Sequence, residues 1–159
     1  KEVFSLWIDH GVKPQNAGYE YIVVPGIDAG SLQTYTNASK INILSNTSEI
    51  QAVQHTGLNL TEIVFYKPGS LKISGELEIT AESPCIIMLK APGGRISEMA
   101  VSDPTQKLQS LRFSVNTLIE GKEDHWQIEQ NNEKKNSVVT VELPKGGYAG
   151  QSVVMKLSH

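Results

Sequence analysis

The apolar residues of this chain recur with a period of two, and this feature most limits the folds it can adopt. In SLKISGELEIT, residues 70–80, every second position of each arm is Leu or Ile, and polar or charged residues stand between them. Because successive side chains of a strand point to opposite faces, such a segment is typical of β-structure with one buried face. The pattern places Leu71, Ile73, Leu77 and Ile79 inward.

Further short runs rich in β-branched and aromatic residues follow one another along the chain, separated by turn residues. They span residues 41–45, 49–55, 61–66, 85–89, 110–115, 125–130, 137–143 and 152–157. Only DAGSLQTYTNAS, residues 28–39, suggests a helical turn, with Asp28 in the position of an N-cap. Many short strands with Gly, Pro, Asn and Asp between them predict an all-β fold, an antiparallel β-sandwich.

The length of 159 residues suits one ordinary domain or two small β units. The segment SGELEITAESP, residues 74–84, separates two apolar groups and suggests a domain boundary. We therefore predict domains at residues 1–77 and 78–159. The sequence begins inside a strand pattern and without Met, so we expect a fragment or a processed product of a longer chain.

The charge balance argues against several classes of partner. With 14 Lys and Arg against 17 Asp and Glu, the net charge is −3, whereas a nucleic-acid binder shows a basic excess. No apolar run approaches the roughly 20 residues needed to cross a bilayer. We therefore expect no nucleic-acid and no membrane partner. A local basic patch could form around Lys122, His125, Lys134, Lys135 and Lys145, but solvated loop charges are the favoured interpretation.

Residues that carry chemistry are few and scattered. Cys85, the single cysteine, lies in the apolar run PCIIML without basic neighbours, which predicts a core thiol and not a nucleophile. His10, His55, His125 and His159 show no metal-binding spacing, so we expect no metal site and no cofactor. No GxSxG elbow or phosphate loop occurs either.

The segment LWIDHGVKPQNAGYEYIVVP, residues 6–25, places a histidine close to two tyrosines. Strand patterns on both sides of the loop GVKPQNAG predict a hairpin. His10 is in phase with Ile8, as it is with Phe4 and Leu6, so its ring should face the core beside Tyr19 and Tyr21. Buried His and Tyr need hydrogen-bond partners, which a hairpin loop supplies. We favour this structural role over a general base, which would need a cleft and a tuned pKa.

The same residues carry a family likeness. The stretch IDHGVKPQNAGYEYIVVP resembles the HG…P…Y-Y…P stretch in the β-sandwich region of polysaccharide lyase family 8. Two further segments agree in the same order, INILSNTSEIQAVQH and ISEMAVSDPTQK, the second with the V-S-D-P-T-Q turn of the C-terminal domain. The chain thus resembles the chondroitin AC, hyaluronan and xanthan lyases over most of its length.

The resemblance implies a large secreted or periplasmic bacterial enzyme built from an α/α toroid, an antiparallel super-sandwich and a small C-terminal β-sandwich. Such enzymes cleave uronate-containing polysaccharides by β-elimination, and their Asn, His, Tyr and Arg catalytic set lies in the toroid. This chain matches the last strands of the super-sandwich and the C-terminal domain, so no catalytic residue carries over. The matching motif residues are interpreted as structural: His10, Gly11, Tyr19, Tyr21, Asp103, Pro104 and Thr105.

Three functional hypotheses follow. The leading one is a non-catalytic C-terminal portion of a glycosaminoglycan lyase, inactive alone, whose partners are the rest of the lyase chain and, through it, an acidic polysaccharide. The alternative is a free-standing carbohydrate-binding β-sandwich, which exposed aromatic rings on one sheet face would favour. Aromatics make up only 6% of the chain, and Trp7 and Trp126 lie far apart in sequence. The third hypothesis is an intrinsic enzyme that uses His10 and Tyr19.

Overall fold

The structure, a computed structural model, describes residue 5 and residues 7–158. The chain divides into two compact units, residues 1–39 and residues 40–159, which we call the N-terminal unit and the C-terminal unit. Among the described residues, no helix is long and apolar enough to cross a membrane.

The N-terminal unit contains one helix, α1 (Ala29–Asn37). Asp28 forms its N-cap: the carboxylate accepts hydrogen bonds from the Ser31 amide at 2.9 Å and from the Ser31 hydroxyl at 2.7 Å. Such a bond satisfies one of the free amides at a helix start. The helical turn expected at residues 28–39, with Asp28 as its cap, is confirmed.

The hairpin expected over residues 3–25 is not present in the part of this segment that the structure describes. Residues 7–28 contain no strand, and their side chains are largely exposed, Trp7 to 78%. The predicted strand positions Val3, Phe4 and Leu6 lie outside the described residues. Since an isolated two-stranded hairpin is at best marginally stable, these strand patterns need a further layer to bury their apolar face.

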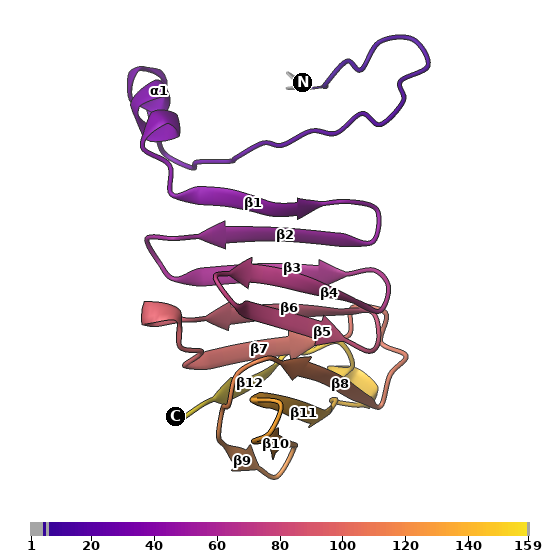
Figure 1. Cartoon of the computed structure of the whole chain (residues 1–159). Helices are drawn as coiled ribbons and strands as arrows, with labels where there is room; N and C mark the ends of the chain where they lie inside the picture. The colour runs from indigo at the N-terminus through magenta and orange to yellow at the C-terminus, as the bar shows by residue number, and fades with distance from the viewer. Residues whose placement is uncertain (1–4, 6, 159) are drawn as a thin grey trace. The chain divides into compact units, whose positions relative to one another are not determined.

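The C-terminal unit contains twelve strands and two short 3₁₀ turns among its described residues (Figure 1). The turns are η1 (Pro92–Gly94) and η2 (Gly146–Tyr148). The strands are β1 (Ile41–Asn46), β2 (Ile50–His55), β3 (Leu60–Phe65), β4 (Gly69–Ser74), β5 (Leu77–Ala81), β6 (Cys85–Lys90), β7 (Glu98–Ser102), β8 (Ser110–Val115), β9 (Lys122–Glu123), β10 (Trp126–Asn131), β11 (Asn136–Glu142) and β12 (Val153–Lys156).

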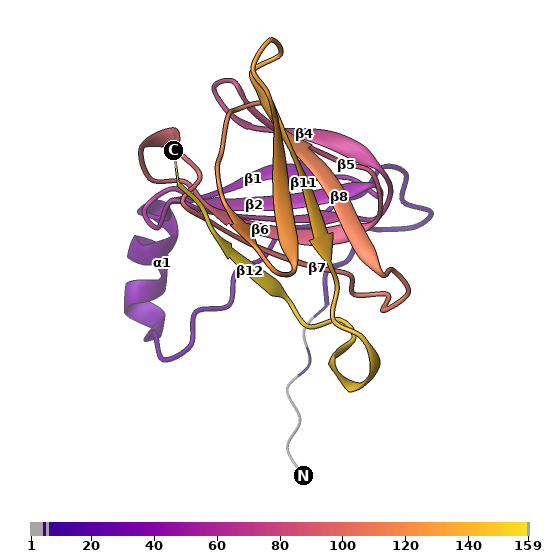
Figure 2. The ribbon, with the colours of Figure 1, turned by 90° about the horizontal axis from the view of Figure 1, so that it is seen from below.

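These strands form two six-stranded sheets packed face to face (Figure 2). Sheet A has the order β1-β2-β3-β6-β7-β12, and sheet B has the order β4-β5-β8-β11-β10-β9. Every strand pair is antiparallel. The predicted all-β antiparallel sandwich is therefore confirmed. Every predicted strand segment from residue 41 onward coincides with an observed strand, whereas β7 and β9 were not among the predicted strands.

The core lies between the two sheets. Leu71, Ile73, Leu77 and Ile79 are all buried there, as the alternation of residues 70–80 predicts. Cys85 is also buried in the core, and this burial, helped by the nearby Asp103 carboxylate, raises the pKa of its thiol to about 12. A thiol with that pKa stays protonated at neutral pH, in agreement with its predicted role as a core residue.

The units of the structure divide at residues 39 and 40, earlier in the chain than the expected boundary at residues 77 and 78. In the structure, residue 77 opens β5, and Ser74 of β4 pairs with Leu77 across a hairpin. The polar residues of SGELEIT, which suggested a linker, are the turn and the outward face of this hairpin. Gly75 allows the tight turn because it adopts a φ of 52°, in the left-handed region.

Candidate functional site

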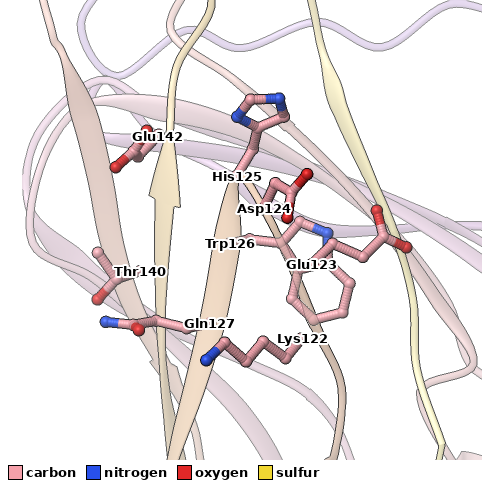
Figure 3. A pocket seen from close by; sticks show the side chains of 8 residues that line it. All are labelled: Lys122, Glu123, Asp124, His125, Trp126, Gln127, Thr140 and Glu142. Atoms are coloured by element: carbon pink, nitrogen blue, oxygen red, sulfur yellow. The ribbon is translucent and has the colours of Figure 1, made fainter.

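A hollow of about 560 Å³ opens on the outer face of sheet B, and we call it the β10–β11 hollow (Figure 3). It is formed by β9, the turn after it, the start of β10 and the facing part of β11. Its lining is mostly polar and consists of Lys122, Glu123, Asp124, His125, Trp126, Gln127, Thr140 and Glu142.

Strand pairing fixes the positions of these side chains. Trp126 pairs with Glu123 of β9, and Gln127 pairs with Thr140 of β11. The turn is held to β11 by a hydrogen bond of 2.7 Å from the Glu142 amide to the His125 carbonyl. Gln127 and Thr140 therefore lie side by side on the outer face, with the hollow above them (Figure 3).

Acidic side chains outnumber basic ones in the β10–β11 hollow. Lys122 and His125 line it together with three acidic side chains, Glu123, Asp124 and Glu142, and the two salt bridges among the described residues lie elsewhere, at Lys67–Glu49 and Arg112–Glu82. Two further lysines of the possible basic patch, 134 and 135, lie at the opposite end of the β10–β11 hairpin. The structure thus separates Lys134 and Lys135 from Lys122 and His125, and acidic side chains outnumber basic ones in the hollow.

The β10–β11 hollow offers hydrogen-bonding and charged side chains around a tryptophan. Trp126 is buried, and its indole Nε1 has no hydrogen-bond partner among the described residues. No group of three or more His, Cys, Asp or Glu side chains is placed to hold a metal ion in the part of the chain that the structure describes. This hollow could not be predicted from the sequence, because it depends on the pairing of β9, β10 and β11, which no local pattern specifies.

A second hollow, of about 540 Å³, lies in the N-terminal unit and is lined by Trp7, Ile8, His10, Tyr19 and Tyr21. We call it the aromatic hollow. The rings of His10 and Tyr19 are 6.2 Å apart between centroids, and Tyr19 and Tyr21 stack at 6.2 Å. The structure thus brings the three motif residues together as the sequence predicts. The prediction that His10, Tyr19 and Tyr21 are buried is wrong for this chain. All three side chains are exposed, as are those of Trp7 and Ile8.

Gly11 follows the histidine at the bend of this segment. Its amide donates to the Asp9 carboxylate at 2.8 Å, and its φ of 75° lies in the left-handed region, which glycine adopts without strain. The local turn is therefore formed even where the strands around it are not. The structural role of His10, Tyr19 and Tyr21 remains a prediction.

This exposure changes what a mutation of the histidine should do. We expect His10→Ala to change the free energy of unfolding of this chain by no more than about 0.5 kcal/mol, the usual effect at an exposed position. A buried, hydrogen-bonded histidine would cost about 1–3 kcal/mol instead. Urea denaturation of the two proteins distinguishes these results, and a loss in the larger range would show that the ring is packed.

The other motif, Asp103, Pro104 and Thr105, forms a tight turn between β7 and β8. Asp103 is buried, and its carboxylate accepts from the amides of Thr105, Lys107 and Leu108, each at 2.8 Å. The Thr105 hydroxyl adds a fourth bond at 2.7 Å. Burial alone would raise the pKa of Asp103, but the bonds from Leu108, Thr105 and Lys107 outweigh it and lower the pKa to about 2. The turn is thus organised around one ionised side chain.

Two family models match successive segments of the sequence. Residues 1–36 match the super-sandwich domain of polysaccharide lyase family 8, and residues 42–112 match its C-terminal β-sandwich domain. The chain belongs to polysaccharide lyase family 8. The junction between the two matches lies within residues 37–41, next to the division between the two units of the structure.

Characterised relatives of this lyase chain are bacterial polysaccharide lyases. Chondroitinase-AC of Pedobacter heparinus is 33% identical over 155 residues, which cover 98% of this chain and 20% of the relative. Hyaluronate lyase of Thermasporomyces composti is 30% identical over 70% of this chain and 14% of the relative. Xanthan lyase of Bacillus sp. strain GL1 is 31% identical over 64% of this chain and 11% of the relative. The chain spans about a fifth or less of the length of these relatives.

Solved structures agree with the fold. A chondroitinase AC lyase studied in complex with oligosaccharides superposes with a TM-score of 0.72 and 30% identity, over 92% of this chain and 19% of that enzyme. The Streptomyces coelicolor A3 chondroitin AC lyase in complex with chondroitin sulphate superposes with a TM-score of 0.69 over 94% of this chain and 19% of that enzyme. At 19% identity, the second likeness concerns the fold alone.

Proposed function

We propose that this chain is the non-catalytic C-terminal β portion of a glycosaminoglycan lyase that cleaves chondroitin or hyaluronan by β-elimination. Its role is to support an N-terminal α/α toroid, which contains the catalytic residues. The observation that carries this proposal is coverage: the chain aligns over 98% of its length with only 20% of a chondroitinase. The matched models are those of the super-sandwich domain and the C-terminal β-sandwich domain.

The chemistry of the two hollows supports a non-catalytic role. β-Elimination next to a uronate needs a group that neutralises the carboxylate and a base that takes the C5 proton. In the aromatic hollow, His10 or Tyr19 could act as the base, but among the described residues no arginine, lysine or amide side chain lines it. The β10–β11 hollow has three acidic side chains, which would repel a uronate.

We also propose the partners and the cellular location of this protein. The partners are the remainder of the lyase polypeptide, with its toroid and the rest of the super-sandwich, and through it the acidic polysaccharide. We place the protein in the secreted or periplasmic space of a bacterium, where polymeric glycosaminoglycans are accessible. Its relatives are bacterial enzymes named for polysaccharide substrates, which supports this assignment.

One observation favours the alternative, a carbohydrate-binding module. Trp7, Tyr19 and Tyr21 are exposed to 78%, 59% and 73% and gather in one hollow. Exposed rings of this kind can stack on the apolar faces of sugars. They lie on a segment whose described residues form no strand, however, so no sheet of that segment holds them in a fixed platform. Binding of chondroitin oligosaccharides by calorimetry, lost in Tyr21→Ala, would support this alternative.

We expect the isolated chain to release no unsaturated uronate from chondroitin or hyaluronan. The measurement is the ultraviolet absorbance of the unsaturated product at micromolar concentrations of the chain, with an active chondroitin lyase as a positive control. The longer polypeptide that contains this chain should be active in the same assay. Turnover by the isolated chain that His10→Ala abolishes would instead show an intrinsic active site in the aromatic hollow.

A further inference from the structure

The two sheets of the C-terminal unit differ in the chemistry of their outer faces. On sheet B, the outward positions are almost all polar, as expected for a sheet that faces water. The one apolar residue among them is Val138, which pairs with Ser114 on one side and with Glu129 on the other. The outward set is Ser70, Lys72, Glu78, Thr80, Ser110, Arg112, Ser114, Asn136, Val138, Thr140, Glu142, Gln127, Glu129 and Asn131.

On sheet A, the outward positions of two adjacent rows are largely apolar, whereas the row next to them is mostly polar and charged, with His55, Leu60, Lys90, Glu98 and Lys156 in register. The strand register carries one row of side chains from edge to edge, interrupted by a single charge at Glu62, and a second, shorter row lies beside it. The first row is Ile43, Val53, Glu62, Met88, Ala100 and Val154. The second is Gln51, Val64, Ile86 and Ser102. We call these ten residues face A.

Four apolar side chains of face A are partly exposed, since no other described part of the C-terminal unit covers them. Ile43 is exposed to 39%, Val53 to 41%, Met88 to 37% and Val154 to 51%. They belong to four different strands, from β1 at one edge of sheet A to β12 at the other. Since face A has no counterpart on sheet B, the asymmetry points to a partner surface on one side of the sandwich.

We propose that face A is a docking surface for the part of the lyase polypeptide that lies outside these 159 residues. This inference rests on the proposed function, which makes the chain one portion of a longer enzyme. Relatives are about five times as long as this chain, which covers 20% of the Pedobacter chondroitinase, so a large covalently linked partner exists in that family. The chemistry of face A calls for a mostly apolar partner surface, bordered by polar groups where it meets Lys90, Glu98 and Lys156.

The size of face A favours a linked partner over a second copy. Six strands spaced about 4.8 Å apart make a row roughly 24 Å wide, so two rows cover a few hundred Å². A stable dimer buries about 800 Å² on each partner. A surface of this size is sufficient when the partner belongs to the same polypeptide, because effective concentrations are then on the order of millimolar.

The three methionines of the chain provide a test. Met88 lies on face A, whereas Met99 and Met155 pair with each other inside the sandwich and are 1% and 0% exposed. Oxidation by hydrogen peroxide follows exposure. In the isolated chain, peptide mass spectrometry should show Met88 oxidised at least about 10-fold faster than the other two. In the longer lyase polypeptide, Met88 should react as slowly as Met99 and Met155.

A matched pair of variants shows whether protection comes from docking. In the longer polypeptide, Val53→Lys places a charge on face A and should restore fast oxidation of Met88. Val138→Lys makes the same change on the outer face of sheet B and should leave Met88 protected. A Val53→Lys protein in which Met99 also reacts quickly has lost its fold, and the milder Val53→Thr then replaces it.

The outcomes separate this inference from the proposed function. Fast oxidation of Met88 in a longer polypeptide that is an active lyase would overturn the docking of face A and leave the proposed function intact. Protection of Met88 in the isolated chain that increases with protein concentration would show a second copy as the occupant and would also overturn it. Protection in a longer polypeptide without lyase activity would support docking and refute the proposed function.

Discussion

Asp103→Ala should lower the free energy of unfolding of this chain by about 1.5–3 kcal/mol, because it removes the buried, charged acceptor of four hydrogen bonds. The carboxylate accepts from the amides of Thr105, Lys107 and Leu108 and from the Thr105 hydroxyl. Alanine offers no acceptor, and the buried position, with Asp103 only 2% exposed, gives water little access to replace it. Urea denaturation followed by circular dichroism measures the loss.

Two variants make the Asp103 result specific. Asp124→Ala removes an exposed carboxylate with no hydrogen bond recorded among the described residues, and it should change stability by less than about 0.5 kcal/mol. Asp103→Asn keeps one acceptor oxygen but turns an NH₂ group toward two of the amides, so its loss should lie between those of the other two. Equal stability of Asp103→Ala and the unsubstituted chain would contradict the central role of this side chain.

The same carboxylate predicts the acid sensitivity of the fold. Its pKa is lowered to about 2 in the folded chain, against an ordinary value of 3.8. The ionised form is therefore favoured by folding, and its contribution to stability is complete above pH 3.8 and is lost as the pH falls to about 2. Asp103→Asn cannot titrate and should show a shallower loss of stability over this interval.

The turn at Asp103 and the hairpin at residues 70–80 were predictable because local chemistry determines both. An Asp before Pro accepts amides of the next few residues whatever surrounds it. Alternation alone assigns Leu71 and Ile79 to the core. The segment at residues 3–25 has an equally regular alternation, yet its described part forms no strand. The difference is that the hairpin at residues 70–80 belongs to a sheet that packs against a second sheet within this chain.

Other features could not be predicted because they depend on pairing between distant segments. β7 is short and has buried residues at consecutive positions, Val101 and Ser102, so it lacks a clear period. The β10–β11 hollow exists only once β9 folds back on β10. One strand of face A could be recognised in the sequence, since CIIML, residues 85–89, is apolar at both odd and even positions. A strand of that kind is typical of a sheet covered on both sides.

Gly121→Ala should destabilise the C-terminal unit by about 2–5 kcal/mol, since backbone strain and a steric clash act together. Gly121 adopts a φ of 150°, which residues with a Cβ rarely adopt. A Cβ built there would lie 2.5 Å from one ring carbon of Trp126 and 2.9 Å from another. The indole is only 3% exposed and packs in the core, so it cannot move aside without disturbing its neighbours.

Two other glycines of the same unit separate strain from clash. Gly146 has a φ of 63° with open space around it. Gly146→Ala should therefore lower the free energy of unfolding through backbone strain alone, by about 1–2 kcal/mol. Gly147 has open space and no left-handed φ, so Gly147→Ala should be close to neutral. The three stabilities, measured by urea denaturation, should therefore rank Gly121→Ala as the lowest and Gly147→Ala as the highest.

Trp126 itself reports the mechanism of this destabilisation. The chain has two tryptophans, and replacing the exposed Trp7 by Phe leaves the fluorescence of Trp126 alone. If the new methyl group displaces the indole, the emission of Gly121→Ala should shift to longer wavelength under native conditions, whereas Gly146→Ala should keep the emission of a buried ring. A Gly121→Ala protein with unchanged emission and unchanged stability would show that the backbone at β9 and the residues before it moves and the indole does not. The close approach of residue 121 to Trp126 would then not stabilise this edge of sheet B.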